Sequence, residues 1–591
     1  MRFSLYTLPA FALLAACSPS AEEAVTTEPT EEVVLAPDGW TYGGMVTAAD
    51  PRAVEAGARV LAAGGHAVDA AIAVHSVLGL VEPQSSGIGG GAFMVVYDHE
   101  SGDVSVFDGR ETAPAAATEN YFVDENGEVR DFITSWQSGL SIGVPGQVAL
   151  YETAYEAFGI VEWPSLFEDA ITLADEGFVV SPRLSGSLSS DRLRAVMQLD
   201  DNPDTAAYFY PEGEPLQPGD TRDNPDYAAT LRAISENGAE AFYTGPIAES
   251  IIASATAGPL GSAMTMEDLA NYEVVVRDAV CGEALSYTIC SAPPPSSGGS
   301  TQNAIMGLYE RFIADLEPDD KDGRLLAFID AQRIAYADRD HYVADADFVT
   351  VPTEDLFNPD YLDVRMNDRF EPGAVPTPGD PGEVLRGEPM IDMWGRDMTE
   401  HAPGTTHISI IDTYGNAVSM TATVESAFGA SRWASGFLLN NELTDFSRAP
   451  TLNGLPIANA PAGGKRPRSS MSPSLVFDDA GDLFMVTGSP GGNQIIAYVS
   501  KTLVGVLDWG MSAQEAVDFP NIIARGETVG VETSRGEGAE IGTMLTGRGY
   551  SVAERSGENS GLHAIVVRED SLEGAADPRR EGIVIAVEAA E

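Results

Sequence analysis

Residues 404–425 read GTTHISIIDTYGNAVSMTATVE, and this stretch predicts the β-hairpin around which the rest of the fold is organised. The segment from Asp412 to Asn416 supplies turn-forming residues, and apolar and polar residues alternate on both sides of it. A turn centred there pairs Ile411 with Ala417. Every other position in the two strands follows from that register.

The predicted register gathers three polar side chains at the open end of the hairpin. Thr405 pairs with Thr423, and the two-residue period of a strand puts Glu425 on the same face as Thr423. A threonine becomes a good nucleophile when a base removes its proton, and its own free α-amino group, with a pKa near about 8, is such a base. Cleavage of the Gly404–Thr405 bond would create that amino group. A threonine-rich amphipathic hairpin without catalytic function is an equally open alternative from this stretch alone.

His407 lies two residues from Thr405 on the same expected strand, which raises the possibility of a nucleophile–base pair. Residues i and i+2 of a strand point the same way but lie about 6.5 Å apart, beyond hydrogen-bond reach. We therefore expect His407 to have a packing role.

Outward from the hairpin, helices and strands fall into separate blocks. Two helices broken at Gly64-Gly65 are expected within residues 47–81, and a glycine loop then leads into a strand hairpin within residues 92–108. Further blocks are helical at 146–271, strand-rich at 274–289, helical at 301–312 and 325–342, and mostly strand after 405, with helices at 494–507 and 513–519. Such segregation favours an α+β fold with layered sheets and helices outside them.

Composition and motif spacing exclude several function classes. The net charge of −57, from 90 acidic and 33 basic residues, argues against a nucleic-acid partner. The glycine loop at 85–91 precedes a strand, whereas a dinucleotide-binding loop follows one. The seven histidines are scattered and show no metal-ligand spacing. We therefore expect no cofactor and no metal.

The first residues have the features of an export signal. Residues 1–16 combine an early arginine with an apolar stretch too short to span a bilayer, and they end in small residues. Leu14-Ala15-Ala16-Cys17 resembles the lipobox of bacterial lipoproteins, in which the cysteine carries the lipid; an ordinary signal peptide is the alternative. Ser18 in place of an aspartate favours the outer membrane for that class. Residues 17–39 are acidic, lack aromatics and are expected to form a tether.

Two other cysteines stand nine residues apart. Cys281 and Cys290 flank a glycine-containing turn between strand-like runs, so they could close a hairpin with a disulfide in an oxidising compartment. Two buried free thiols are the other possibility.

The hairpin resembles the signature of the γ-glutamyltranspeptidases, self-processing N-terminal nucleophile hydrolases that act on glutathione and other γ-glutamyl amides. Blocks similar to that family follow in family order from about residue 40 to the C terminus: Arg110 to Pro114, Gly143 to Gly146, Pro293 to Gly299, Leu438 to Phe446, Lys465 to Pro473 and Thr487 to Gly492. The resemblance implies a four-layer αββα sandwich. It also implies self-cleavage before Thr405 into a large subunit, 40–404, and a small catalytic subunit, 405–591, that stay in one folded unit.

The resemblance also assigns substrate-binding residues, and their chemistry suits the assignment. A γ-glutamyl group carries an α-carboxylate and an α-ammonium, so its site needs a fork-shaped cation, hydroxyl donors and acids. Arg110, Ser469 and Ser470 match the family's carboxylate-binding residues. Glu442 and Asp445 match its amine-binding residues.

The catalytic residues implied by the resemblance surround the nucleophile. Gly491 and Gly492 correspond to the family's oxyanion-binding pair, which presents adjacent backbone N–H groups without side chains to obstruct them. Thr423 corresponds to the threonine that helps to activate Thr405. Glu425 stands where many members carry asparagine, so its role is less defined.

The implied reaction forms a γ-glutamyl ester on Thr405, which water, an amino acid or a peptide then resolves. Residues 447–465 contain no tyrosine, tryptophan or phenylalanine, so we expect a short lid without an aromatic gate, which leaves the balance between hydrolysis and transfer open. One alternative is a glutaryl or cephalosporin acylase of the same superfamily, whose substrates lack the α-ammonium that Glu442 and Asp445 would bind. The other is a catalytically inactive surface lipoprotein, against which the intact Thr405 and Thr423 argue.

Overall fold

The structure, a computed structural model, describes residues 40–399, 404–556 and 560–588. The predicted export signal, the acidic tether and Cys17 lie outside these ranges, so the structure bears on none of them. Within the described ranges, no helix has both the length and the apolar character that a membrane span requires.

The predicted hairpin forms with the expected register. β9 (Thr405–Ile411) and β10 (Ala417–Thr423) pair antiparallel, Ile411 opposite Ala417 and Thr405 opposite Thr423. The turn is held by the Asp412 carboxylate, which accepts hydrogen bonds from the backbone N–H groups of Tyr414 and Asn416 at 2.9 and 3.0 Å. The prediction from turn residues and alternation is therefore confirmed.

β9 and β10 lie at the centre of a seven-stranded sheet with the order β22-β1-β9-β10-β2-β3-β6. The other five strands are β1 (Gly44–Ala48), β2 (Gly91–Tyr97), β3 (Val104–Gly109), β6 (Val275–Asp278) and β22 (Ile583–Val587). Strands from before and after residue 404 thus alternate in one hydrogen-bonded sheet.

A second sheet of six strands has the order β21-β20-β16-β15-β8-β7. Its strands are β7 (Val280–Ala284), β8 (Tyr287–Ser291), β15 (Ser474–Phe477), β16 (Leu483–Gly488), β20 (His563–Val567) and β21 (Leu572–Ala576). β16 and β20 pack against β9, and β16 also packs against β10. The two sheets therefore face each other.

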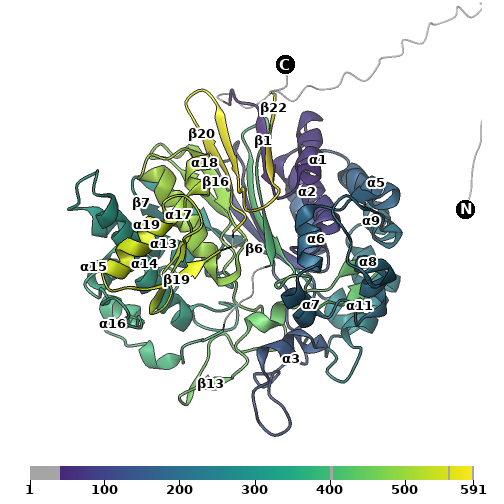
Figure 1. Cartoon of the computed structure of the whole chain (residues 1–591), viewed down its shortest axis with the longest axis horizontal. Helices are drawn as coiled ribbons and strands as arrows, with labels where there is room; N and C mark the ends of the chain where they lie inside the picture. The colour runs from purple at the N-terminus through teal and green to yellow at the C-terminus, as the bar shows by residue number, and fades with distance from the viewer. Residues whose placement is uncertain (1–39, 400–403, 557–559, 589–591) are drawn as a thin grey trace, which may run out of the picture. The chain divides into compact units, whose positions relative to one another are not determined.

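Helices cover the outer face of each sheet (Figure 1). The first sheet is covered by α1 (Pro51–Ala62), α2 (Ala67–Val81) and α4 (Gln147–Phe158), and the second by α13 (Gly298–Ile313), α17 (Ile495–Leu507) and α18 (Ala513–Asp518), with α14 (Lys321–Tyr342) packed on α13. The order of layers is α, β, β, α. This is the predicted four-layer sandwich.

The two faces of the central strands β9 and β10 have different surroundings. Ile408 and Ile410 point toward the helical layer and belong to its apolar core, as do Val418 and Met420 of β10. The opposite face is polar, yet it is buried between the two sheets. There the His407 ring is within 2.9 Å of the hydroxyls of both Thr421 and Ser409. Both ring nitrogens are thus engaged away from Thr405, which supports the packing role.

The remaining helices and short strands complete the two sides. The helices are α3 (Phe132–Trp136), α5 (Glu168–Glu176), α6 (Pro182–Leu188), α7 (Asp191–Met197), α8 (Pro203–Phe209), α9 (Pro225–Asn237), α10 (Glu240–Tyr243), α11 (Gly245–Ala255), α12 (Met266–Ala270), α15 (Pro359–Arg365), α16 (Pro381–Arg386) and α19 (Gly538–Gly547). The short strands are β4 (Phe178–Val179), β5 (Thr221–Arg222), β11 (Trp433–Ala434), β12 (Phe437–Leu438), β13 (Thr451–Leu452), β14 (Leu455–Pro456), β17 (Ile522–Ile523), β18 (Thr528–Glu532) and β19 (Ser551–Arg555).

One predicted boundary and one omission need correction. The first helix begins at Pro51 rather than near residue 47, because residues 44–48 pair with β9 and β22 in the sheet. α19 was not predicted, since three glycines in its ten residues hide the helical pattern.

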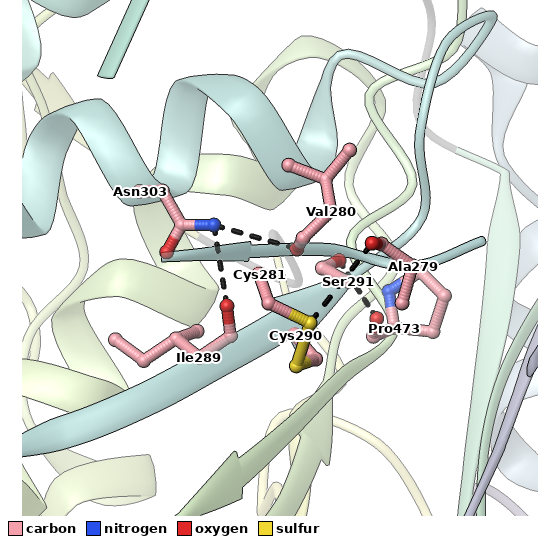
Figure 2. The surroundings of a disulfide bond; sticks show 8 residues. All are labelled: Ala279, Val280, Cys281, Ile289, Cys290, Ser291, Asn303 and Pro473. Atoms are coloured by element: carbon pink, nitrogen blue, oxygen red, sulfur yellow. Dashed lines mark hydrogen bonds between the residues drawn. A yellow bond between two sulfur atoms is a disulfide. The ribbon is translucent and has the colours of Figure 1, made fainter. Parts of the chain in front are cut away.

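Cys281 and Cys290 lie opposite each other on β7 and β8 and are joined by a disulfide (Figure 2). Asn303 of α13 donates from its side-chain amide to the carbonyl oxygen of Ile289 at 3.2 Å, which fixes this hairpin to the helix that covers it. Of the two possibilities that the sequence left open, the structure has the disulfide.

Candidate active site

The residues predicted from the sequence meet around one small cavity at the open end of the β9–β10 hairpin. Its volume is about 20 Å³, and it is lined by Arg110, Thr405, Thr423, Glu425, Glu442, Asp445, Ser469, Ser470, Met471, Gly492 and Ile495. Of the predicted catalytic and substrate-binding residues, Gly491 alone is missing from this lining, and it directly precedes Gly492. Segments more than 300 residues apart in the sequence are thus brought to one point.

Thr423 connects the hydroxyl of Thr405 to the peptide bond that precedes it. The Thr423 hydroxyl donates to the carbonyl oxygen of Gly404 at 2.7 Å and accepts from the backbone N–H of Glu425 at 2.8 Å. It also lies 3.0 Å from the hydroxyl oxygen of Thr405. A hydroxyl has one proton to give, and Thr423 gives it to Gly404, so Thr405 is the donor in the Thr405–Thr423 pair. The lone pairs of Thr405 therefore remain available for attack.

Glu425 reaches the cavity by a different route from the one expected. β10 ends at Thr423, and Glu425 has a φ of 76°, so the chain has left the strand before this residue. The carboxylate accepts hydrogen bonds from the Asn441 side-chain amide at 2.5 Å and from the Ser426 hydroxyl. Glu425 therefore lines the cavity together with Thr405, as predicted, but strand alternation is not the reason.

Arg110 is buried and faces two carboxylates at once. Its guanidinium contacts Glu442 and lies 2.6 Å from Asp445, and it also donates to the backbone carbonyls of Pro467 and Arg468 at 3.2 and 3.1 Å. Burial raises the pKa of both acids, and Arg110 opposes that effect. Arg110 thus pairs with two buried acids at once.

Glu111 adds a third acid beside this group, and sequence reasoning did not single it out as a site residue. Burial raises the pKa of Glu111 to about 8, although the charge of Arg110 lowers it. Its sequence signal was its place in the family-like block from Arg110 to Pro114, which by itself assigns it no role.

Gly491 and Gly492 have backbone conformations that side chains disfavour. Their φ values are 138° and 57°, in the region where glycine is preferred. They stand at the start of a short 3₁₀ turn that leads into α17, and the first N–H groups of a helical segment have no partner within it. The pair can therefore offer N–H groups to an oxyanion in the cavity that Gly492 lines.

Ser469 and Ser470 are held by two segments of the large N-terminal part. The carbonyl oxygen of Ser469 accepts from the Ser297 backbone N–H at 2.9 Å and from its hydroxyl at 2.6 Å. Ser470 accepts from the guanidinium of Arg339 on α14. Arg339 was missed in the sequence because its charge-rich helix has the pattern of a solvated one.

The segment 447–465 contains the short β13–β14 hairpin, labelled β13 in Figure 1. The Asn459 side chain anchors the segment that follows the hairpin. It donates to the carbonyl oxygen of Asp445 at 2.8 Å and to the Asp397 carboxylate at 2.9 Å. These hydrogen bonds therefore connect the segment that carries the hairpin to the backbone of Asp445, one of the acids of the site.

Comparison with known proteins agrees with this geometry. The family model described as gamma-glutamyltranspeptidase matches residues 53–587. The chain is 34% identical over 555 residues to the glutathione hydrolase proenzyme of Bacillus subtilis (strain 168), covering 92% of this chain and 91% of that one. It is 35% identical over 547 residues to the glutathione hydrolase proenzyme of Escherichia coli (strain K12), covering 91% and 90%.

Solved structures share the fold. A cephalosporin acylase from Bacillus halodurans superposes with a TM-score of 0.79 at 24% identity, over 96% of this chain and 99% of that one. A gamma-glutamyltranspeptidase from Helicobacter pylori is 36% identical with a TM-score of 0.51, over 54% of this chain and 90% of that one. The sandwich is thus the N-terminal nucleophile hydrolase fold. With the family model matched across nearly its whole length, the chain belongs to the gamma-glutamyltranspeptidase family.

Proposed function

We propose that this chain is a self-processing glutathione hydrolase and γ-glutamyltransferase whose nucleophile is Thr405. The observation that carries the proposal is the double role of Thr423, whose hydroxyl contacts both the Thr405 hydroxyl and the Gly404 carbonyl oxygen. The names of the Bacillus subtilis and Escherichia coli relatives, both called proenzymes, support it.

Self-cleavage follows from the arrangement at Gly404 and Thr405. The Thr405 oxygen attacks the Gly404 carbonyl carbon, the C–N bond breaks, and the hydroxyl proton ends on the released α-amino nitrogen. The resulting ester is hydrolysed by water, which leaves a carboxylate on Gly404 and a free Thr405 at the new N terminus. Thr423 assists by donating to the carbonyl oxygen as negative charge develops there.

The two products, 40–404 and 405–591, would remain together. β2 of the first pairs with β10 of the second, and β1 of the first lies between β9 and β22 of the second. Their separation would break the central sheet.

Donor binding exchanges one set of ion pairs for another. The α-carboxylate of a γ-glutamyl group pairs with Arg110 and accepts hydrogen bonds from the hydroxyls of Ser469 and Ser470. Its α-ammonium pairs with Glu442 and Asp445. Glu425 lines the same cavity and adds negative charge near the ammonium. Glu442 and Asp445 share Arg110, which favours a donor that brings a cation of its own. A glutaryl donor brings no ammonium group to these buried acids.

The transfer reaction then uses the new N terminus. The free α-amino group of Thr405 accepts the hydroxyl proton, Thr405 forms an ester with the γ-carbonyl carbon, and the amine leaves with a proton. Gly491 and Gly492 provide N–H groups for the oxyanion. Water resolves the ester to glutamate, or the amine of an amino acid or peptide takes the acyl group. None of these steps calls for a metal or a cofactor.

The cellular setting is part of the proposal. We place the protein outside the cytoplasm, as a periplasmic lipoprotein anchored to the bacterial outer membrane through a lipid on Cys17. The Cys281–Cys290 disulfide supports an oxidising compartment. Radiolabelled palmitate would enter the parent protein and not a Cys17→Ala variant; equal labelling of both would disprove the anchor.

Two measurements test the activity. The purified protein should run as two chains on a denaturing gel, one with Thr405 at its N terminus by mass spectrometry, and Thr405→Ala should run as one. The cleaved protein should release p-nitroaniline from γ-glutamyl p-nitroanilide much faster than from glutaryl p-nitroanilide. An uncut chain would overturn the enzyme proposal. Preference for the glutaryl donor would instead favour the acylase, and the 24% identical acylase structure bears on the fold alone.

A further inference from the structure

Arg339 lies behind the cavity and holds three separate loops. It is buried on α14, and its Nε donates to the Ser297 hydroxyl at 2.8 Å. Its Nη2 donates to the Ser470 hydroxyl and lies 3.4 Å from the side-chain oxygen of Asn493. Asn493 directly follows the glycine pair, and Ser470 lines the cavity. One guanidinium therefore joins the expected carboxylate-binding and oxyanion-binding segments.

The contact with Arg339 decides which way the Ser470 hydroxyl points. A guanidinium is a donor only, so Ser470 must accept from it and direct its own proton elsewhere. That proton has the Asn493 side-chain oxygen as a partner at 3.5 Å, a long contact that an incoming carboxylate can replace. The positive charge on Arg339 also polarises the hydroxyl and strengthens it as a donor.

Arg339 belongs to a cluster of guanidiniums and carboxylates within the described part of the chain. Asp340 is its first counter-ion, at 2.8 Å, and also contacts Arg525 at 3.2 Å and Arg396 at 3.4 Å. Arg468 and Asp397, paired at 2.9 Å, adjoin these groups, since the backbone N–H of Asp397 donates to the carbonyl oxygen of Asp340. Burial lowers the pKa of Arg339 to about 10, which leaves it charged at neutral pH. Arg339 thus places a positive charge next to the Ser470 hydroxyl.

We propose that Arg339 is a positioning residue that orients Ser470 as a donor toward the α-carboxylate of the substrate. This inference rests on the proposed γ-glutamyl function. It implies that Arg339 contributes to recognition of the carboxylate without touching it.

The test compares two donors that differ only in that carboxylate, γ-glutamyl p-nitroanilide and γ-aminobutyryl p-nitroanilide. Arg339→Met should lower kcat/KM for the first by about tenfold or more, the factor to which about 1.4 kcal/mol corresponds, and should change the second much less. Because the effect passes through Ser470, adding Arg339→Met to Ser470→Ala should produce little further loss on the γ-glutamyl donor.

Arg333 offers a matched control on the same helix. It is equally buried, but its guanidinium donates to the carbonyl oxygens of Phe370 and Ala374, both at 2.7 Å, on a loop outside the cavity lining. Arg333→Met should lower the activity on both donors by the same factor, if at all. Equal losses on both donors in the Arg339 variants as well would overturn the proposal.

Arg339→Lys keeps the positive charge but loses the planar guanidinium. It is the variant to use if Arg339→Met fails to fold or to cleave itself. If both Arg339 variants fail while Arg333→Met is processed, Arg339 serves folding and the proposal is wrong. If the parent protein hydrolyses neither donor, the proposed function itself has failed, which is a different outcome.

Discussion

Thr405 and Thr423 face each other across β9 and β10 with their hydroxyl oxygens 3.0 Å apart, and Thr423 alone also reaches the Gly404 carbonyl. Substitution of Thr423 should therefore affect cleavage and turnover together. Thr423→Ala should slow appearance of the new N terminus by roughly 100-fold, as expected for the loss of one oxyanion donor. Thr423→Ser keeps the hydroxyl and should process at nearly the parent rate. A time course on denaturing gels measures both, and rapid processing of Thr423→Ala would contradict the role.

Asp445 should control donor selectivity. Asp445→Asn removes one negative charge from the ammonium side of the site while it keeps the shape. The ratio of kcat/KM for γ-glutamyl over glutaryl p-nitroanilide should fall by about tenfold or more, since a buried charge-assisted hydrogen bond is lost with one donor only. Because both donors are assayed on one preparation, folding losses cancel. An unchanged ratio would remove Asp445 from substrate binding.

Gly492→Ala should impair catalysis more than stability. A left-handed conformation costs a non-glycine residue about 1 to 2 kcal/mol, and the same cost applies at Gly481, which has a φ of 87° in an exposed turn. Gly481→Ala is therefore the control. Both variants should lose similar stability in urea, but kcat should fall by roughly 100-fold only for Gly492→Ala. Equal kcat in the two variants would argue against an oxyanion role.

Acid should destabilise the fold through His563. Burial lowers the pKa of His563 to about 4, whereas an unfolded histidine titrates near about 6.5. The unfolded state therefore binds the proton first, and stability falls as the pH drops from about 6.5 toward 4, by up to about 1.4 kcal/mol per pH unit. Urea unfolding of the parent and His563→Gln at pH 7 and pH 5 tests this. The variant should lose less stability between the two pH values, and an equal loss would exclude His563 as a source.

The disulfide should matter for stability and not for turnover. It closes a loop of nine-residue separation at an edge strand, so its loss should cost about 2 to 3 kcal/mol. Cys281→Ser and Cys290→Ser should each unfold at lower urea concentration than the parent, with kcat/KM unchanged. Reductant should lower the parent's midpoint and leave the variants unaffected; a parent insensitive to reductant would show that the bond contributes little.

The sequence was sufficient to predict the features that depend on neighbouring residues or on family motifs. The turn at Asp412 determines the register that places Thr405 opposite Thr423, and this depends on neighbouring residues alone. The motif residues Arg110, Glu442 and Ser470 were found by resemblance, and the structure brings them to one cavity.

What the sequence could not predict depends on tertiary packing. Arg339 lies in a stretch with charges at close intervals, which is typical of an exposed helix, and only the packing of α14 against the rest of the protein buries it. Glu425 was placed by strand periodicity, which fails where the backbone turns left-handed.

The strand order β22-β1-β9-β10-β2 also predicts the outcome of a genetic complementation experiment. If the chain is cleaved before Thr405 as proposed, each small chain would hold β1 of its own large chain between its strands β9 and β22, so partners should not be swapped between molecules. Two defective alleles, one altered at Arg110 and one at Thr423, should fail to complement each other when expressed in one cell. Each active molecule would be the product of a single translated chain.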